Sequence, residues 1–350
     1  MKNGKSRDPH GLINEIFKPG VGGNDLQISL VMMMNRIKDT IFIPKHVEYA
    51  TIVSIYKGRG DKMDLLSDHG IFIVNIFRSI LMKLSYQDKY QVVDKNMSDS
   101  NVGVRKNKNI RNHIFVLNSV INDVIQNKKQ SIDVEILDYK QCFDSMWMEE
   151  CVNDLWEAGI KDDHLALIYE VNKNMNVAVK TPFGLTDRHN LSRLVMQGEV
   201  YGQLCCSVQV DTFGKECINK NKYLYKYKET VGIPPLSMVD DLVLISTCGL
   251  NSVLINGFIN CKTNIKKLQF GIEKCHKMYV GMKNHLCPDL YIDGWELKST
   301  DSMNTGVSGL VDNFVGSCGV EESESEKYLG DIICKDGRNQ KNVEVRQGKG

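Results

Sequence analysis

The stretch that most constrains the fold is residues 236–246, LSMVDDLVLIS, where two adjacent aspartates interrupt an otherwise apolar run. Burying an unpaired carboxylate is unfavourable, and a second carboxylate beside it adds repulsion. We therefore expect a β-hairpin in which Val239 ends one strand, Asp240 and Asp241 form the turn, and Leu242 begins the next strand, since Asp is common in turns. Adjacent carboxylates on a tight turn also suit a hard divalent cation, and the two interpretations are compatible.

A third carboxylate stands in a similar setting. Residues 132–138, IDVEILD, alternate apolar and acidic side chains and predict a strand that ends at Asp138. A strand-end carboxylate together with a hairpin pair can hold two divalent ions about 4 Å apart, which suits phosphoryl and nucleotidyl transfer. Acidic strand ends are also frequent on solvated surfaces, so the spacing by itself leaves that alternative open.

The composition is that of an ordinary globular protein, with 42% hydrophobic and 25% charged residues in a chain of 350. The net charge of +1 provides no general attraction to nucleic acid, so any such attraction must come from local patches. No apolar run approaches ~20 residues, and we expect no membrane partner. The cysteines lack zinc-finger spacing, and we interpret them as reduced thiols of an intracellular protein in the cytoplasm or nucleus.

Helical and strand periodicities interleave without strict βαβ repetition, which favours the α+β class. In residues 222–228, KYLYKYK, the tyrosines alternate with other residues and predict a strand beside the 236–246 hairpin, with its tyrosine side packed inward. Residues 300–326 are rich in Ser, Gly and Glu and are interpreted as a loop. Helices are expected at 24–38, 72–90, 145–159, 162–175 and 197–214, strands at 48–56 and 132–138, and a hairpin at 176–186. An amphipathic helix is also expected at 114–125, where apolar residues repeat at helical spacing directly after a basic cluster.

The order of several motifs resembles a reverse transcriptase, and more narrowly the type found in non-LTR (LINE-like) retrotransposons. The motifs are DYKQCFD, QG opening a helix, MVDD, FGIEKC and KYLG, preceded by SRDPHGL, ATIVSIYKGRGDKMD, DHGIFIVNIFRSIL and VGVRKNKNIRNH. The resemblance extends over roughly residues 5–338. It implies an α+β right-hand polymerase fold with fingers and palm, the thumb being largely absent.

The resemblance also implies a domain order. Residues 1–130 would form the fingers region with an N-terminal extension, and residues 131–298 the palm with the catalytic motifs. Residues 299–326 would be a loop, and residues 327–350 the primer-grip hairpin with a truncated start of the thumb. Because the chain has no room for an upstream endonuclease, we expect it to be a fragment of a longer element.

Roles at the catalytic centre follow from the same resemblance. Asp138 and Asp240 would each contact both of two Mg²⁺ ions, with Mn²⁺ as an alternative, and Asp241 would be the second carboxylate of the hairpin. Lys274 would be the general acid that protonates pyrophosphate, with Lys277 as the next candidate. A solvated surface position is the ordinary alternative for a lone lysine.

Further residues would contact the substrates, which are an RNA template, a DNA primer and deoxynucleoside triphosphates. Phe143 would exclude the 2′-hydroxyl of the sugar, with core packing as the alternative. The other nucleotide-binding candidates are Lys57, Lys62, His69, Tyr139, Gln197 and Gly198. Tyr328, Leu329 and Gly330 would position the primer end. The basic residues that could follow template phosphates, or form a solvated charged face, are Arg105, Lys106, Lys108 and Arg111.

One departure from the family concerns His69, which stands where the family usually has an arginine that grips the triphosphate. A guanidinium offers fixed, always-charged donors, whereas a histidine near neutral pH is mostly uncharged. The sequence therefore leaves two principal hypotheses, an RNA-directed DNA polymerase domain or an inactive retroelement remnant with residual RNA or DNA binding. A template-independent or DNA-dependent polymerase shares the metal site and is a third.

Overall fold

The structure is a computed structural model in which the chain forms two compact units, residues 1–97 with 143–208 and residues 98–142 with 209–350. The helix α7 (Val200–Asn219) and the short α4 (Cys142–Ser145) each contain residues of both units. The described residues are 4, 6–18, 21–56, 58, 61, 63, 68–127, 131–191, 199–219, 224–228, 231–247, 250–271, 274–281, 291–292, 318–319, 325–328 and 331–334. Among them, no helix combines the length and apolar character needed to cross a membrane.

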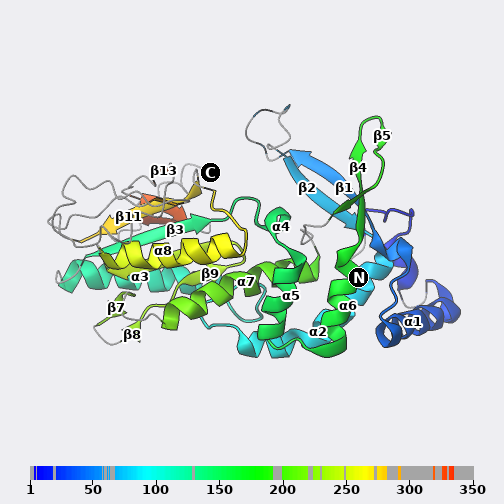
Figure 1. Cartoon of the computed structure of the whole chain (residues 1–350), viewed down its shortest axis with the longest axis horizontal. Coiled ribbons are helices and arrows are strands. Elements are labelled where there is room, and N and C mark those ends of the chain that lie inside the picture. Colours follow the sequence, from blue (N-terminus) through cyan, green and yellow to red (C-terminus); the bar gives the residue numbers. More distant parts are fainter. Residues whose placement is uncertain are drawn as a thin grey trace. The chain divides into compact units, whose positions relative to one another are not determined.

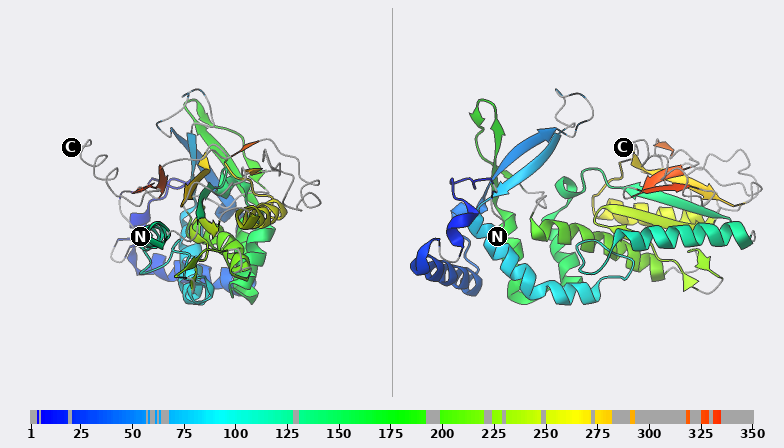
Figure 2. Two further views of the ribbon diagram at one scale, coloured as in Figure 1. Left: turned by 90° about the vertical axis from the view of Figure 1, so that its left-hand side faces the viewer. Right: turned by 180° about the vertical axis from the view of Figure 1, so that it is seen from behind.

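The first unit is built on a five-stranded sheet in the order β2-β1-β4-β5, with β6 also paired to β4. Figures 1 and 2 show β1, β2 and the β4–β5 hairpin projecting from the helices of this unit. The strands are β1 (Tyr49–Tyr56), β2 (Asp68–Val74), β4 (Met175–Thr181), β5 (Gly184–Leu185) and β6 (His189–Leu191). The helices are η1 (Asn14–Phe17), α1 (Gly23–Thr40), η2 (Lys45–Glu48), α2 (Ile76–Asn96), α5 (Met148–Glu157) and α6 (Asp162–Lys173).

The second unit contains a four-stranded antiparallel sheet in the order β11-β3-β10-β9. Its strands are β3 (Ile132–Asp138), β9 (Leu236–Met238), β10 (Asp241–Thr247) and β11 (His276–Val280), and its helices are α3 (Ile110–Asn127) and α8 (Leu250–Ile265) (Figure 1). Short strand pairs add β7 (Lys226–Tyr227) with β8 (Val231–Gly232), β12 (Tyr291–Ile292) with β13 (Cys318–Gly319), and β14 (Ser325–Tyr328) with β15 (Asp331–Cys334).

The core of the second unit lies between the apolar face of α3 and the apolar face of β3. Leu117, Ile121 and Val124 repeat at helical spacing along α3, and they pack with Ile132, Val134 and Ile136, which alternate along β3. The intervening Asp133 and Glu135 are also buried, so β3 is covered on both faces rather than half-solvated as its alternation suggests. Lys277 of β11 lies 3.5 Å from Asp133, which partly balances the charges on this second face.

One predicted helix begins later than its apolar spacing indicates. The predicted helix 72–90 starts at Ile76, because residues up to Val74 pair with β1 in β2. Asn75 then caps α2, its side-chain oxygen accepting a hydrogen bond from the Phe77 N–H at 2.8 Å. The expected boundary was therefore wrong by about one turn, since strand pairing with a distant segment decided it.

The tyrosine-rich segment partly matches its prediction. Tyr225 is buried, and its N–H donates to the Ile245 carbonyl at 3.2 Å, so this point of the segment lies beside β10. Of the residues that the structure describes in this segment, Lys226 and Tyr227 alone form a strand, which pairs with β8. Tyr227 is half-buried, and Tyr223 lies outside the described residues. Most of the predicted 300–326 loop lies outside them too, although residues 318–319 and 325–326 belong to strands.

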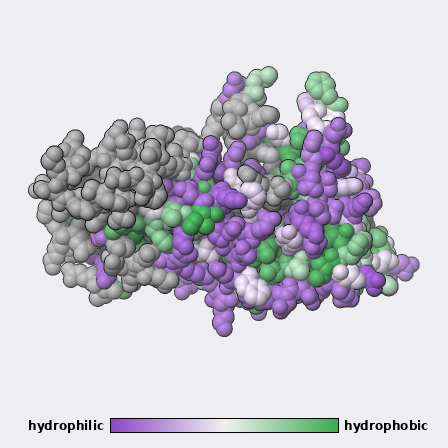
Figure 3. Space-filling view, in the orientation of Figure 1, coloured by the Kyte–Doolittle hydropathy of each residue, from purple (hydrophilic) through white to green (hydrophobic). Residues whose placement is uncertain are grey.

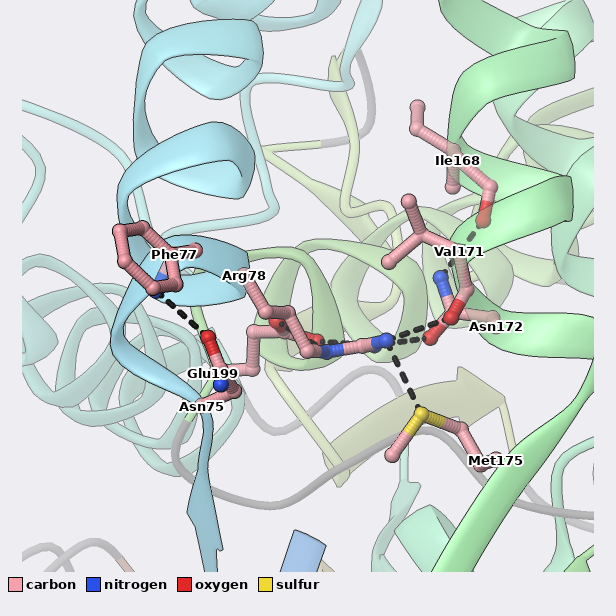
Figure 4. Close-up of polar contacts among 8 residues, drawn as sticks. All are labelled: Asn75, Phe77, Arg78, Ile168, Val171, Asn172, Met175 and Glu199. Atoms are coloured by element: carbon pink, nitrogen blue, oxygen red, sulfur yellow. Dashed lines mark hydrogen bonds and ion pairs between the residues drawn. The ribbon is translucent and has the colours of Figure 1, made fainter. Parts of the chain in front are cut away.

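A buried arginine joins distant elements of the first unit. Arg78 of α2 is fully buried and makes a bidentate ion pair with Glu199, with both N···O distances at 2.9 Å (Figure 4). Its remaining guanidinium donors reach the Val171 carbonyl, the Asn172 side chain at 2.6 Å and the Met175 sulfur at 3.0 Å. Because one side chain satisfies partners on α6, β4 and the residue before α7, Arg78 determines how these segments meet.

We expect Arg78→Met to destabilise the protein by about 3–5 kcal/mol, because it leaves the Glu199 carboxylate buried without its partner. Arg36→Met on the exposed surface of α1 is the matched control and should change stability by no more than about 0.5 kcal/mol. Adding Glu199→Leu to Arg78→Met should restore part of the loss. Urea unfolding of the three variants measures these changes, and an Arg78→Met loss no larger than the control's would contradict this role.

Candidate active site

Two of the predicted catalytic carboxylates lie on paired strand ends. Asp138 is the last residue of β3, Asp241 is the first residue of β10, and the antiparallel register sets them directly opposite each other. Side chains in such cross-strand pairs have Cβ atoms about 4.5–5.5 Å apart. The pairing of two strands therefore brings together residues that are about a hundred positions apart in the sequence.

The hairpin turn is displaced by one residue from its predicted position. The turn residues are Val239 and Asp240, because Asp241 already pairs with Met238 on one side and with Asp138 on the other. Val239 has φ +58°, a left-handed conformation that is unfavourable for a β-branched residue. The expected Asp240–Asp241 turn is thus wrong, and the shift matters because a one-residue change of register reverses the face to which each side chain points.

Two backbone hydrogen bonds hold Lys274 near the end of β3. The Gly271 N–H donates to the Asp138 carbonyl at 2.9 Å, and the Lys274 N–H closes a tight turn onto the Gly271 carbonyl at 2.8 Å. The Lys274 Nζ then lies 2.7 Å from Asp138 Oδ1. The Lys274 side chain is 39% exposed and that of Asp138 24%, so this ion pair contributes little stability and leaves the ammonium accessible from solvent.

The hairpin carboxylates bind protons unusually well. Burial raises the pKa of Asp241 to about 7, and repulsion from Asp240 and Asp138 adds to the effect while Lys274 opposes it. Burial also raises the pKa of Asp240, and the Asp138 charge adds to that shift. A cluster of carboxylates whose charges are this poorly compensated favours the arrival of a cation or a proton.

The chemistry of the donor set fits a hard divalent cation, although the site is not a preformed cage. Asp138, Asp240 and Asp241 offer only carboxylate oxygens, which are the ligands that Mg²⁺ prefers. In the part of the chain that the structure describes, no three His, Cys, Asp or Glu side chains have the geometry of a ready-made metal site. The Lys274 ammonium is the positive charge that already faces Asp138.

The predicted nucleotide-binding residues are distributed unevenly. Tyr139 is buried, its ring stacked on Phe270 with 4.6 Å between centroids, so that its side chain belongs to the core. Phe143 is half-buried in α4, and the backbone of His69 pairs with Ile55 between β2 and β1. Lys57, Lys62, Gln197 and Gly198 lie outside the described residues.

The remaining predicted residues concern the primer end and the second lysine. Tyr328 is the last residue of β14, where its backbone pairs with Asp331, while Leu329 and Gly330 lie outside the described residues. Lys277, the second candidate for a general acid, is buried in β11 and lies near Asp133 rather than at the carboxylate cluster. The structure thus separates the two lysines, with Lys274 alone paired to Asp138.

The basic cluster is partly occupied by contacts within the protein. The Arg105 guanidinium donates to the Ser98 carbonyl at 2.6 Å and to the Asn101 carbonyl at 3.2 Å, so it holds its own loop together. Lys108 Nζ lies 2.9 Å from the Asp99 carboxylate. The other two members, Lys106 and Arg111, are exposed.

The sequence analysis missed the ion pair between Arg78 and Glu199. Glu199 directly precedes α7 and follows the predicted Gln197–Gly198 segment, and its carbonyl accepts from the Gly202 N–H at 3.1 Å. A signal for it exists in the sequence, because Arg78 interrupts the apolar spacing of NIFRSIL, and a buried arginine requires an acidic partner. Nothing local identifies that partner, which is 121 residues away.

Comparison with solved structures finds similarity to telomerase chains. The telomerase of Candida albicans, in complex with the TWJ fragment of telomeric RNA, has a TM-score of 0.50 at 12% identity and covers 77% of this chain and 47% of that one. The corresponding Candida tropicalis complex has a TM-score of 0.49 at 13% identity, covering 81% and 49%. The chain spans about half the length of these structures.

At 12% identity, the similarity to the Candida albicans telomerase concerns the fold alone. It supports a polymerase-like fold of mixed α and β structure, without its finer details. No family model matches the chain, and no curated protein matches it.

The raised pKa of Asp241 predicts how stability depends on pH in buffers that contain EDTA. Between the ordinary pKa of 3.8 and the folded value of about 7, the folded protein binds more protons than the unfolded chain. Stability contributed by this group is therefore highest at low pH and is lost as the pH rises through that window. We expect Asp241→Asn to be more stable than the wild type at pH 8 by about 1–2 kcal/mol, with the difference vanishing near pH 4.

Urea unfolding at several pH values measures this difference. Asp39→Asn, at an exposed position of α1, is the control and should follow the wild-type pH dependence. Identical pH dependence in Asp241→Asn and wild type would show that Asp241 titrates normally in the folded chain.

Proposed function

We propose that the chain is an RNA-directed DNA polymerase domain of a retrotransposon-derived protein, acting by two-metal nucleotidyl transfer. The observation that carries this proposal is the cross-strand pair of Asp138 and Asp241, with Asp240 in the adjoining turn and Lys274 against Asp138. The order of motifs along the chain supports the same assignment, and so does the polymerase-like fold. The substrates in this proposal are an RNA template, a DNA primer and deoxynucleoside triphosphates.

The three carboxylates would hold two Mg²⁺ ions. When bound, divalent ions at such a site activate an attacking oxygen and stabilise the charge that develops on a leaving pyrophosphate. Asp240 and Asp241 contribute negative charge that is poorly compensated within the protein, as their raised pKa values indicate, whereas Asp138 is paired with Lys274. Their mutual repulsion is therefore the source of cation affinity.

Lys274 would hold the proton needed by the leaving group. Its ammonium lies 2.7 Å from Asp138 Oδ1 and is partly exposed, so it combines a fixed position with access from solvent. A positioned lysine can transfer its proton to a pyrophosphate oxygen as that oxygen gains charge. In this role Asp138 orients the Lys274 ammonium toward the site.

Two observations favour the alternative of an inactive remnant that retains nucleic-acid binding. His69 stands where the resembled family has a triphosphate-binding arginine. In the basic cluster, Arg105 and Lys108 already have partners within the protein, which reduces the charge free for a template. Both observations concern substrate affinity, whereas the carboxylates and Lys274 concern the chemical step.

Primer extension on an RNA template with Mg²⁺ tests the proposal. Asp240→Asn and Asp138→Asn should each reduce nucleotide incorporation by about two orders of magnitude or more, because each removes charge worth several kcal/mol in the transition state. Asp39→Asn should leave incorporation unchanged, as its side chain is exposed on α1. Incorporation that is equal in wild type and Asp240→Asn would refute a catalytic role for the carboxylates.

His69→Arg separates an affinity defect from a chemical one. If His69 occupies the triphosphate-binding position, the variant should bind the incoming nucleotide about ten- to a hundredfold more tightly, because one charge-assisted hydrogen bond is gained. The apparent affinity for deoxynucleotide in the primer extension assay measures this change, and RNA binding should remain constant. An unchanged nucleotide affinity would show that another residue occupies the arginine's position.

A further inference from the structure

Helix α1 of the first unit carries apolar side chains on two opposite sides. One side packs on the rest of the unit, where Met34 and Ile37 are buried. On the other side, Ile28, Val31 and Met32 are 57%, 56% and 68% exposed. These three positions follow the i, i+3, i+4 spacing of a single helical face, so their side chains form one apolar strip. We call this strip the outer face of α1.

Contacts with the rest of the first unit set the orientation of the outer face. Besides the packed opposite side, Lys38 in the last turn of α1 lies 3.7 Å from Asp88 of α2. Just outside the two ends of the helix, Val21 and Phe42 are also exposed. Figure 3 shows hydrophobic residues gathered in the region where Figure 1 places α1. Single exposed apolar side chains are ordinary on a protein surface, but several adjacent ones mark a contact with another molecule.

The charged residues beside the outer face have opposite signs at its two ends. Asp25 lies in the first turn of α1 and Arg36 near its C-terminal end, and both side chains are exposed. At 3.6 residues per turn the two positions are about three turns apart, so they lie along the same edge of the helix. Met32 is next to that edge. One edge of the apolar strip therefore begins with a carboxylate and ends with a guanidinium.

This arrangement is complementary to itself. When two copies of a helix pack antiparallel about a two-fold axis, the same edge of each helix faces its counterpart, and every contact occurs twice. With the axis near Leu30, Ile28 of one copy meets Met32 of the other. The same register brings Asp25 of one copy to Arg36 of the other, so the apolar strip is covered and both charges are paired.

We propose that the outer face of α1 is a homodimer interface, on which a second copy of this chain docks antiparallel. The charge of the helix favours this occupant over an anionic one. Two acidic residues, Asp25 and Asp39, balance two basic ones, Arg36 and Lys38, so α1 attracts neither nucleic acid nor an anionic membrane. The interface contains no residue of the carboxylate cluster, and the inference is independent of the proposed polymerase function.

The size of this contact sets the expected affinity. An interface of one helix from each copy lies at the small end of the range for protein complexes, below ~1,200 Å² of buried surface. We therefore expect a reversible dimer with a Kd on the order of 10 μM, which leaves the chain mostly monomeric at about 1 μM.

Sedimentation velocity of the full chain, from about 1 to 200 μM, tests the inference by mass action. The weight-average mass of the wild type should rise from monomer toward dimer. Met32→Asp should weaken association at least about tenfold, because it buries two carboxylates in an apolar contact. Phe115→Asp is the matched control, since Phe115 is 73% exposed on α3 of the second unit, and it should associate like the wild type.

Charge reversal tests the antiparallel arrangement itself. Asp25→Arg and Arg36→Asp should each weaken association about tenfold, because each places like charges together twice in the dimer. The double variant should return to within about threefold of the wild-type Kd, since both ion pairs are restored with their signs exchanged. The double variant opposes the helix macrodipole at both ends, so its recovery cannot come from a more stable helix.

Three results would overturn the inference. They are a wild-type chain that stays monomeric at every concentration, association that Met32→Asp leaves unchanged, and a double variant that dimerises no better than its two single variants. Asp240→Asn should associate like the wild type, so a failure of the proposed polymerase function leaves the result unaffected. Thermal melting of each variant confirms that a loss of association does not come from unfolding.

Discussion

The antiparallel pairing of β3 with β10 places two like charges directly across from one another, and the candidate active site depends on this constraint. Directly opposed carboxylates destabilise a sheet, and the neighbouring Asp240 increases the repulsion. The ammonium of Lys274 offsets part of this repulsion, because backbone hydrogen bonds hold Lys274 where its side chain forms an ion pair with Asp138. The remainder is relieved by a proton, as the raised pKa of Asp241 indicates, or by a divalent cation in the function proposed for the chain.

In the first unit, by contrast, the buried charges of Arg78 and Glu199 neutralise each other within the protein. Arg78 is more deeply buried than any of the three aspartates, yet its guanidinium donors all reach acceptors, including both oxygens of Glu199. A fully satisfied buried pair fixes the arrangement of its helices, because losing either partner leaves an isolated charge. Incompletely satisfied charge at Asp240 and Asp241 instead creates affinity for something outside the chain. This contrast supports a structural role for the first group and a chemical role for the second.

Attraction to nucleic acid cannot be deduced from the number of basic residues alone. Residues 103–113 have four Lys or Arg residues and no acidic one, but Arg105 and Lys108 are used within the protein. Arg7 and Lys180 are isolated cations in the sequence, yet the fold brings both to the lining of one cavity beside the sheet of the first unit. The charge that remains free of internal partners determines the electrostatic contribution to binding.

Local patterns were sufficient to locate several elements, and tertiary pairing decided the details of the site. The bounds of β3 at 132–138, the hairpin within 236–246 and the amphipathic α3 follow from periodicities that a strand or helix imposes on nearby residues. The sequence also indicated that Asp138 and the aspartate pair occupy similar strand-end settings. It could not place the turn at Val239 and Asp240, because that register depends on pairing with β3. The Arg78–Glu199 pair likewise depends on a contact between distant segments, which no local periodicity encodes.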